Sequence, residues 1–528
     1  MSASVRTGTL SGVEAHPVLV EVSGIRGLPG LELVGLPEAA IRESRARVTA
    51  ALRNSGFELP EQRFVVNLAP ADLRKSGASF DLALAIALLS HCGLCAPNRL
   101  DHTLIIGELA LDGSLRAVRG VLAQLRSARA GGLERAIVPE ADAAWAALVP
   151  DLQVHCAAHL TDVVAFLEGN RTLPGPVGEP APLVPYAGPD LCQVRGQETA
   201  KRALEVAAAG GHNLLMVGPP GTGKTMLASR LPGLLPPPSP EEALDIATIA
   251  SAGGLKPPKN ARAARPFRAP HHSASEAALI GGGDPIRPGE VTLAHGGVLF
   301  LDELPEFRRA ALEALRPTME SGVAAIARAR ERLSMPAAPI VIAAMNPCPC
   351  GYRGDRRRVC RCGPDQVQRY RARVSGPLLD RFDMHVALAP LPVQALERGA
   401  PGETSDAVRA RVVTARAAAS ARRAQCRASD DRRTDLERLA GDLAPGALRL
   451  LHRSMEQLRL SLRAYTKILR VARTIADLEG VQRVETPHVA EAVQYRLLDR
   501  QAAEFDGPVP APADRRGRTT DIPTETSN

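Results

Sequence analysis

Aromatic residues are scarce in this sequence. Phe, Trp and Tyr account for 3% of the 528 residues, and there is a single Trp. Proteins that hold single-stranded nucleic acid by stacking depend on a series of aromatic rings, each placed against a base. The composition therefore argues against an extensive stacking platform. It leaves open proteins that grip nucleic acid through its phosphate backbone.

Long apolar runs and a secretion signal are also missing. The longest apolar run, Leu82 to Leu89, is too short to cross a bilayer. The first ten residues, MSASVRTGTL, lack the basic stretch and apolar segment of a signal peptide. We therefore expect a cytoplasmic protein with no membrane partner. In a reducing cytosol, clusters among its nine Cys indicate metal binding or catalysis before disulfides.

What the sequence does have is a surplus of positive charge. Lys and Arg number 65 against 57 Asp and Glu, which gives a net charge of +8 and a pI near 9.2. This balance suits an anionic partner such as nucleic acid. The charge alone is equally compatible with a basic protein that has no such partner.

The order of strand-like and helical patterns indicates an α/β protein followed by a helical region. The predicted parts are an α/β domain at 1–171, a Pro- and Gly-rich linker at 172–189, a second α/β domain at 190–395, a helical domain at 396–505 and a disordered tail at 506–528. For the last helix we predict Thr486 as the N-cap and Pro487 as the first helical residue.

A phosphate-binding loop follows an apolar strand in the second domain. The stretch NLLMVGPPGTGKT matches G-x-x-x-x-G-K-[ST] between a strand and a helix, which is the context that the motif requires. Glycines let backbone N–H groups surround the phosphates, Lys224 reaches the β- and γ-phosphates, and Thr225 ligates Mg²⁺. The predicted ATP-binding residues are Gly218, Pro219, Pro220, Gly221, Thr222, Gly223, Lys224 and Thr225.

Two further apolar strands end in polar residues suited to ATP hydrolysis. The strand 298–301 is followed by Asp302, predicted to hold Mg²⁺, and Glu303, predicted to polarise the attacking water. The strand in APIVIAAMN ends at Asn346, whose amide can orient that water without competing as a base.

Together these motifs resemble an AAA+ ATPase core. The stretches RPFRAPHHSAS, AAMNPCPCGY and SGPLLDRFDMHV look more narrowly like the YifB/ComM family of magnesium-chelatase-like ATPases, and this resemblance extends to about residue 500. It implies that Asn346 is the sensor-1 residue and that Arg381 is an arginine finger acting on a neighbour's nucleotide. It also implies that Arg463, or else Arg470, is the sensor-2 residue of a C-terminal helical lid. The expected assembly is a homo-hexamer that uses ATP and Mg²⁺.

Two segments characterise the first domain, ADLRKSGASFDLALAIALL and IIGELALDGSLRAVRGVLAQLRSARAGGLERAIVPE. They resemble the Lon protease domain, a ribosomal-S5-domain-2-like fold. Ser79 falls where that family keeps its nucleophile, but Leu122 occupies the position expected for the general-base lysine. Leucine cannot activate a hydroxyl, and Lys75 lies in the wrong segment. We therefore expect an inactive dyad and a domain used for structure or partner binding.

Four cysteines form two Cys-x-Cys pairs just after Asn346. Cys348, Cys350, Cys360 and Cys362 could hold a structural Zn²⁺, although the spacing is tighter than usual. Reduced free thiols and a redox role are the alternatives.

A predicted hairpin at 321–337 places Arg328, Arg330 and Arg332 near its tip. In the clade of AAA+ proteins that includes chelatases, insertions at this place face the central pore, so these arginines are candidate DNA contacts. The alternative is an ordinary charged hairpin.

The resulting hypothesis is a hexameric ATP-driven DNA motor, a branch-migration helicase acting on branched or single-stranded DNA in recombination and natural transformation. A magnesium-chelatase-type motor subunit for tetrapyrroles is the first alternative, but no D-x-S-x-S motif is present. An ATP-dependent Lon-like protease is the second, and the missing base argues against it.

Overall fold

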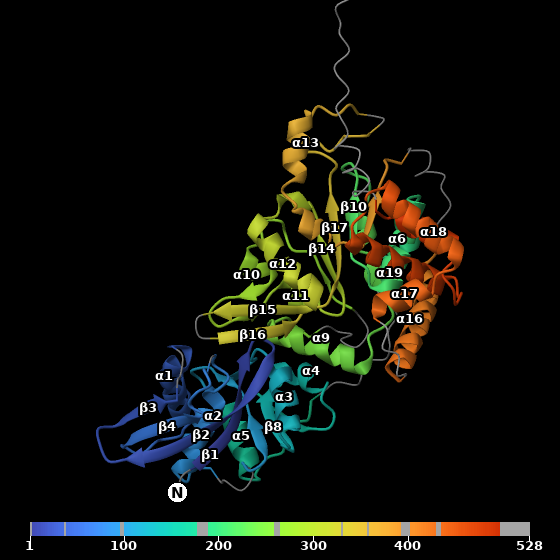
Figure 1. Cartoon of the computed structure of the whole chain (residues 1–528). Coiled ribbons are helices and arrows are strands. Elements are labelled where there is room, and N and C mark those ends of the chain that lie inside the picture. The colour runs from blue at the N-terminus through green and yellow to red at the C-terminus, as the bar shows by residue number, and fades with distance from the viewer. Residues whose placement is uncertain are drawn as a thin grey trace, which may run out of the picture.

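The computed structural model describes most of the chain in three parts (Figure 1). The described residues are 3–35, 39–75, 77–95, 100–176, 188–257, 265–328, 331–355, 358–391, 402–428 and 434–496. Most of the predicted linker, the predicted tail 506–528 and Arg330 lie outside these ranges. None of the helices within them is long and apolar enough to span a membrane.

The N-terminal part is built on a seven-stranded mixed sheet with the order β3–β4–β2–β1–β5–β8–β9. Its strands are β1 Ala3–Ser11, β2 Glu14–Ile25, β3 Gly30–Val34, β4 Arg63–Ala69, β5 Thr103–Ile105, β8 Arg135–Pro139 and β9 Gln153–Ala157, with a small hairpin of β6 Glu108–Leu109 and β7 Leu115–Arg116. Its helices are α1 Ala39–Asn54, α2 Asp81–His91, α3 Val121–Ala130, α4 Ala143–Ala146 and α5 Leu160–Leu167. Helix α2 is buried from Asp81 to Leu89, and its apolar residues Leu82 to Leu89 belong to this part's main core. The predicted α/β character is confirmed.

The central part is a five-stranded sheet in which every pairing is parallel, with the order β11–β14–β17–β10–β18. The strands are β10 Leu214–Val217, β11 Phe267–Arg268, β14 Val298–Leu301, β17 Ile340–Met345 and β18 Met384–Ala387. All residues of β10, β14 and β17 are buried. Helices cover both faces of such a sheet, which explains why these strands read as continuous apolar runs instead of alternating patterns. The predicted parallel P-loop core is confirmed.

Shorter elements surround this sheet. The helices are α6 Glu198–Gly210, α7 Lys224–Ala228, α8 Leu231–Leu234, α9 Pro240–Ala252, α10 Glu276–Leu279, α11 Glu290–Leu293, α12 Arg309–Ser321, α13 Pro364–Arg371 and α14 Gly376–Leu379. Two hairpins are formed by β12 Gly281–Gly282 with β13 Arg287–Pro288, and by β15 Val323–Arg328 with β16 Glu331–Pro336. The second is the hairpin predicted at 321–337.

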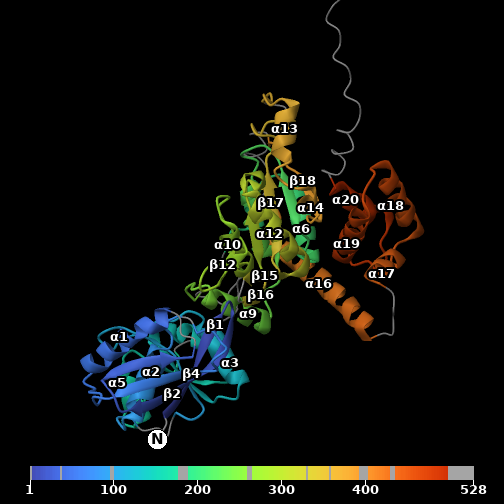
Figure 2. The same ribbon diagram turned by 60° about the vertical axis from the view of Figure 1, so that its left-hand side comes forward.

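The C-terminal part is helical, as predicted. Its helices are α16 Ser405–Ala428, α17 Asp435–Gly441, α18 Pro445–Gln457, α19 Leu462–Leu478 and α20 Thr486–Gln494. They lie to one side of the sheet and share a core with α6 and β10 (Figure 2). The predicted start of α20 is wrong by one residue, because Glu485 is the N-cap and Thr486 is already helical. The backbone N–H of Glu485 donates to His488 Nδ1 at 2.8 Å, which closes a reciprocal cap.

The N-terminal part docks on the central part through α9 and the β15–β16 hairpin (Figure 1). Arg126 of α3 pairs with Asp245 of α9 at 2.8 Å, and the backbone N–H of Gly120 donates to the backbone O of Ser251, also on α9, at 3.0 Å. On the hairpin, the turn after β1 lies against Leu333 so closely that a Cβ on Gly12 would come within 2.3 Å of it. Helix α9, which lies between the P-loop and Asp302, and the β15–β16 hairpin, which follows Asp302, therefore supply a platform for the first domain.

Candidate active site

The candidate ATP-site residues meet at the carboxyl edge of the central sheet. The loop 218–223 follows β10, Asp302 follows β14, and Asn346 follows β17. Strand β17 is inserted between β10 and β14, with Val217 paired to Met345 and Leu301 to Ala343. This strand order places the asparagine between the phosphate-binding loop and the acidic pair. In open α/β sheets, ligands bind at the carboxyl ends of the strands, where these residues lie.

The phosphate-binding loop has the backbone that its glycines permit. Gly221 and Gly223 have φ values of +76° and +88°, in the left-handed region that side chains disfavour. The hydroxyl of Thr222 donates to Pro219 O at 2.9 Å, which closes the loop on itself. The loop's N–H groups are thereby arranged to surround an anion.

Lys224 lies at the mouth of this loop. Its ammonium donates to Gly218 O at 2.7 Å, to Pro219 O at 3.0 Å and to Asn346 Oδ1 at 3.1 Å. Burial lowers its pKa, while Asp302 and Glu303 oppose that shift. The β- and γ-phosphates of a nucleotide would supply stronger, charged acceptors at the same place.

Thr225 and Asp302 form a suitable pair of magnesium ligands. The Thr225 hydroxyl donates to Asp302 Oδ2 at 2.7 Å, so a hydroxyl and a carboxylate oxygen face each other beside the loop. Oxygen ligands of this kind, few in number and next to the phosphates, are what Mg²⁺ uses in nucleotide sites. The residues present therefore fit the predicted ion.

Glu303 has a strained backbone conformation. Its φ is +52°, uncommon for a non-glycine residue, and its N–H donates to Asp302 Oδ1 at 2.9 Å. The carboxylate is exposed and lies 3.3 Å from His272 Nδ1. His272 is a site residue that sequence reasoning missed. The double histidine of RPFRAPHHSAS was the available signal.

Arg381 lies at the opposite edge of the sheet from Lys224 in the same chain. It belongs to the turn just before β18, and its backbone O accepts from Asn213 Nδ2 at 3.4 Å, where β10 begins. The four residues of β10 span about 13 Å between the two edges. Its guanidinium is nearly buried and pairs with Glu320 of α12. A single chain therefore does not bring Arg381 to its own P-loop.

The turn that carries Arg381 is held by two cations of the helical part, which sequence reasoning also missed. Lys467 of α19 donates to the backbone O of Asp380 and, at 2.9 Å, to that of Phe382. Arg496, fully buried, donates to Phe382 O at 3.0 Å. Burial lowers the pKa of Lys467 to about 8.

Arg463 lies near this turn and not near the P-loop of its own chain. Its guanidinium is 3.8 Å from Asp380 Oδ2, and 62% of its side chain is exposed. Arg470, the alternative, lines a cavity beside His212, which precedes β10. Both candidates therefore lie toward the amino edge of the strands.

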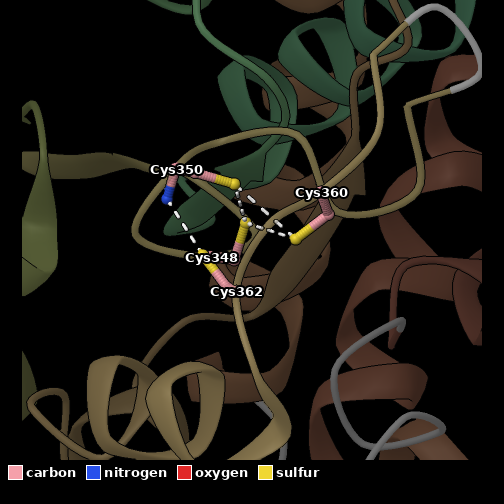
Figure 3. Close-up of side chains that lie close together, drawn as sticks. All are labelled: Cys348, Cys350, Cys360 and Cys362. Atoms are coloured by element: carbon pink, nitrogen blue, oxygen red, sulfur yellow. Dashed lines mark hydrogen bonds between the residues drawn. The ribbon is translucent and has the colours of Figure 1, made fainter.

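The four cysteines form one cluster in the chain that follows β17 (Figure 3). Cys348 Sγ lies 3.4 Å from Cys350 Sγ and 3.6 Å from Cys360 Sγ. The backbone N–H of Cys350 donates to Cys362 Sγ at 3.4 Å. The sequence predicted this group as one site, and the structure brings its members together.

Of the candidate DNA contacts, Arg328 and Arg332 belong to the β15–β16 hairpin, and Arg330 lies outside the described residues. Arg332 is exposed, whereas its neighbours Leu333 and Met335 turn toward the N-terminal part, as strand alternation requires. The backbone of Arg328 pairs with Glu331. One face of the hairpin is therefore docked, and the face that carries Arg332 is open.

The inactive protease dyad remains a prediction that a protease assay can test. Leu122 is fully buried in α3, in a different core cluster from α2, which Ser79 precedes. The ammonium of Lys75 donates to the backbone O of Pro70. Among the described residues, no contact joins the Ser79 hydroxyl to a base.

We expect Ser79→Ala to leave the protein unchanged in a protease assay. Neither the parent nor the variant should cleave an unfolded protein such as casein with ATP, because Leu122 cannot take the hydroxyl proton. A Lon-type protease serves as the positive control. Cleavage by the parent that Ser79→Ala abolishes would contradict the assignment.

Comparison with known proteins gives matches along nearly the whole chain. The family models described as "Subunit ChlI of Mg-chelatase", "Magnesium chelatase, subunit ChlI" and "Magnesium chelatase, subunit ChlI C-terminal" match residues 20–142, 190–396 and 402–496. YifB of Salmonella typhimurium is 45% identical over 94% of this chain and 97% of its own length. YifB of Escherichia coli gives the same values. Competence protein ComM of Haemophilus influenzae is 45% identical over 93% of this chain and 96% of its own length.

Proposed function

This chain belongs to the YifB/ComM family of magnesium-chelatase-like AAA+ ATPases, and from that premise we propose that it is the subunit of a hexameric ATP-driven motor that migrates DNA branches. The observation that carries the proposal is that Lys224 and Arg381 lie at opposite ends of strand β10 in the same chain. A site that needs both residues can form only between two chains. Repetition of one such head-to-tail contact closes a ring.

In the proposed mechanism, each group of the carboxyl edge has one task. Lys224 and the loop N–H groups hold the phosphates of ATP, and Thr225 with Asp302 would hold Mg²⁺, which neutralises phosphate charge when bound. Glu303 accepts a proton from the attacking water, and Asn346 orients that water. Arg381 from the neighbouring chain stabilises the charge that develops on the transferred phosphoryl group.

The placement of Arg463 beside the Arg381 turn supports a role for the helical lid at the same interface. Arg381 and Arg463 both lie toward the amino edge of the sheet. Lys467 and Arg496 hold the turn that carries Arg381 by hydrogen bonds to Phe382 O. We propose that Arg463 also acts on the neighbour's nucleotide. Because the helical lid binds the turn that carries Arg381, a movement of the lid can shift Arg381 at the interface with the neighbouring chain.

DNA is the proposed substrate of the motor. The name of the Haemophilus influenzae relative refers to competence, the net charge is +8, and Arg332 is exposed on the free face of the hairpin. Arginines that contact phosphates would give binding that is largely independent of sequence and sensitive to salt. The proposal for the reaction is migration of a three-way junction with ATP.

We expect DNA to stimulate the ATPase and Arg332→Ala to weaken that stimulation. Loss of one phosphate contact per chain should lower DNA affinity and reduce the slope of log K against log salt by about one for each contact engaged. The matched control is Arg453→Ala, which removes an exposed arginine of α18. Fluorescence anisotropy across salt concentrations and strand exchange on a three-way junction are the measurements. An ATPase indifferent to DNA would contradict the proposal.

A chelatase motor is the second candidate, because all three matching family models are described by the ChlI subunit of magnesium chelatase. It predicts ATP-dependent stimulation of magnesium insertion into a porphyrin when the remaining chelatase subunits are supplied. The DNA motor predicts no such effect, so this assay and the junction assay separate the two.

A further inference from the structure

The loop that carries the four cysteines lies directly against the phosphate-binding loop. Gly351, between Cys350 and Tyr352, is buried and has a φ of +85°. A Cβ built on it would lie 2.6 Å from Pro220 Cδ and 3.9 Å from Asn346 Cγ. Glycine is therefore required there both for its backbone conformation and for the close approach. The cysteine loop forms part of the wall of the candidate ATP site.

The sulfur atoms have the spacing of a metal site. Cys350 Sγ and Cys360 Sγ are 3.6 Å apart, Cys348 Sγ is similarly close to both, and the four sulfur atoms lie within 4.8 Å of one another. In a tetrahedral site with Zn–S bonds of about 2.3 Å, neighbouring sulfur atoms are about 3.8 Å apart. All four cysteines are free thiols in the structure. The cluster needs little rearrangement to enclose one ion.

Apolar packing contributes little to the described chain on the solvent side of the cluster. Val359 is 89% exposed, and the described part of the loop is held mainly by polar contacts, with Arg358 donating to the Tyr352 hydroxyl at 2.7 Å and lying over its ring. Such a surface buries too little apolar area to order a loop by itself, whereas a metal can supply that free energy. Cys348, by contrast, is fully buried. The cluster is thus anchored at one end in the core.

We infer that Cys348, Cys350, Cys360 and Cys362 bind one Zn²⁺, and that this zinc knuckle, whose described residues are 348–355 and 358–362, fixes the wall of the ATP site through Gly351. Four thiolates close the coordination sphere, so the ion is structural and takes no part in hydrolysis. Binding ties residues 348–351 to residues 360–362 and holds Gly351 against Pro220. The inference depends on the proposed function only in taking the 218–225 loop as an ATP site.

The first test measures the metal. Full-length protein purified under reducing conditions should contain about one Zn²⁺ per chain by plasma mass spectrometry. Cys360→Ser should lose most of that zinc, and Cys92→Ser, a half-buried cysteine of the N-terminal part, should keep it. Protein without zinc, or with iron in its place, overturns the inference.

The second test measures nucleotide binding with a fluorescent ATP analogue and no DNA. Stripping zinc from the parent with a chelator should weaken ATP binding roughly tenfold, and returning Zn²⁺ should restore it. Gly351→Ala should keep its zinc yet bind ATP more weakly, because the added methyl displaces Pro220. Circular dichroism confirms that each protein is folded. An ATP affinity that is unchanged after Zn²⁺ is removed overturns the inferred link between the zinc site and ATP binding. Because neither test involves DNA or strand exchange, failure of the motor assignment leaves both readouts intact.

Discussion

Arg381→Ala should nearly abolish ATP hydrolysis while leaving ATP binding intact. Arginines supplied across an interface contribute about three orders of magnitude or more in related phosphoryl-transfer enzymes. The residue lies at the amino edge of the sheet, separated from its own P-loop by the length of β10, about 13 Å, so its removal does not disturb the loop that binds the phosphates. Steady-state ATPase rates and equilibrium binding of an ATP analogue, measured on the same assembled protein, check both halves of the expectation.

Two controls separate this role from a structural one. Glu320→Gln weakens the intrachain ion pair but keeps the arginine, so hydrolysis should fall far less. Mixing Arg381→Ala chains with Lys224→Ala chains should restore up to about a quarter of the parent rate, because a quarter of randomly mixed interfaces pair an intact loop with an intact arginine. Full activity of Arg381→Ala, or no recovery on mixing, would contradict an active site shared between chains.

Glu303→Gln should stop turnover after ATP has bound. An amide cannot accept the proton of the attacking water, whereas the loop, Lys224 and the Thr225–Asp302 pair are unchanged. A loss of about two orders of magnitude or more is expected, since general-base catalysis contributes about that much. The variant should accumulate ATP-bound rings on DNA. Rapid-quench measurement of hydrolysis and gel filtration with labelled ATP and DNA test this.

His272→Ala provides the comparison for that variant. His272 contacts Glu303 at 3.3 Å without replacing it as a base. Removing the imidazole should change the rate modestly and leave ATP turnover detectable, in contrast to Glu303→Gln. If the two variants lose activity equally, Glu303 is not the sole base of the reaction, and the assignment of roles must change.

Local patterns predicted much of this structure correctly. Strands β10, β14 and β17 are apolar runs, and the glycine-rich loop, Asp302 and Asn346 follow them in that order. The hairpin at 323–336 and the helical C-terminal part were also predicted from periodicity. These features depend on neighbours in sequence, which is why a single sequence suffices for them.

What the sequence could not predict depends on long-range pairing. The contact between Lys224 and Asn346 joins residues 122 apart and exists only because β17 inserts beside β10. The hydrogen bond from Lys467 to Phe382 O also joins residues far apart in sequence, and neither residue type predicts it. The predicted start of α20 is wrong because its N-cap is Glu485, not one of the usual Ser, Thr, Asp or Asn, and because His488 takes the N3 position usual for Glu or Gln.

Because the loop and the arginine lie on opposite edges, every chain takes part in two sites. A chain carrying both Lys224→Ala and Arg381→Ala would therefore silence the pocket on each of its flanks. In a cell that makes intact and doubly altered chains in equal amounts, only about a quarter of interfaces would keep both residues. Such an allele should be dominant over the normal copy, even though the protein it encodes folds and assembles.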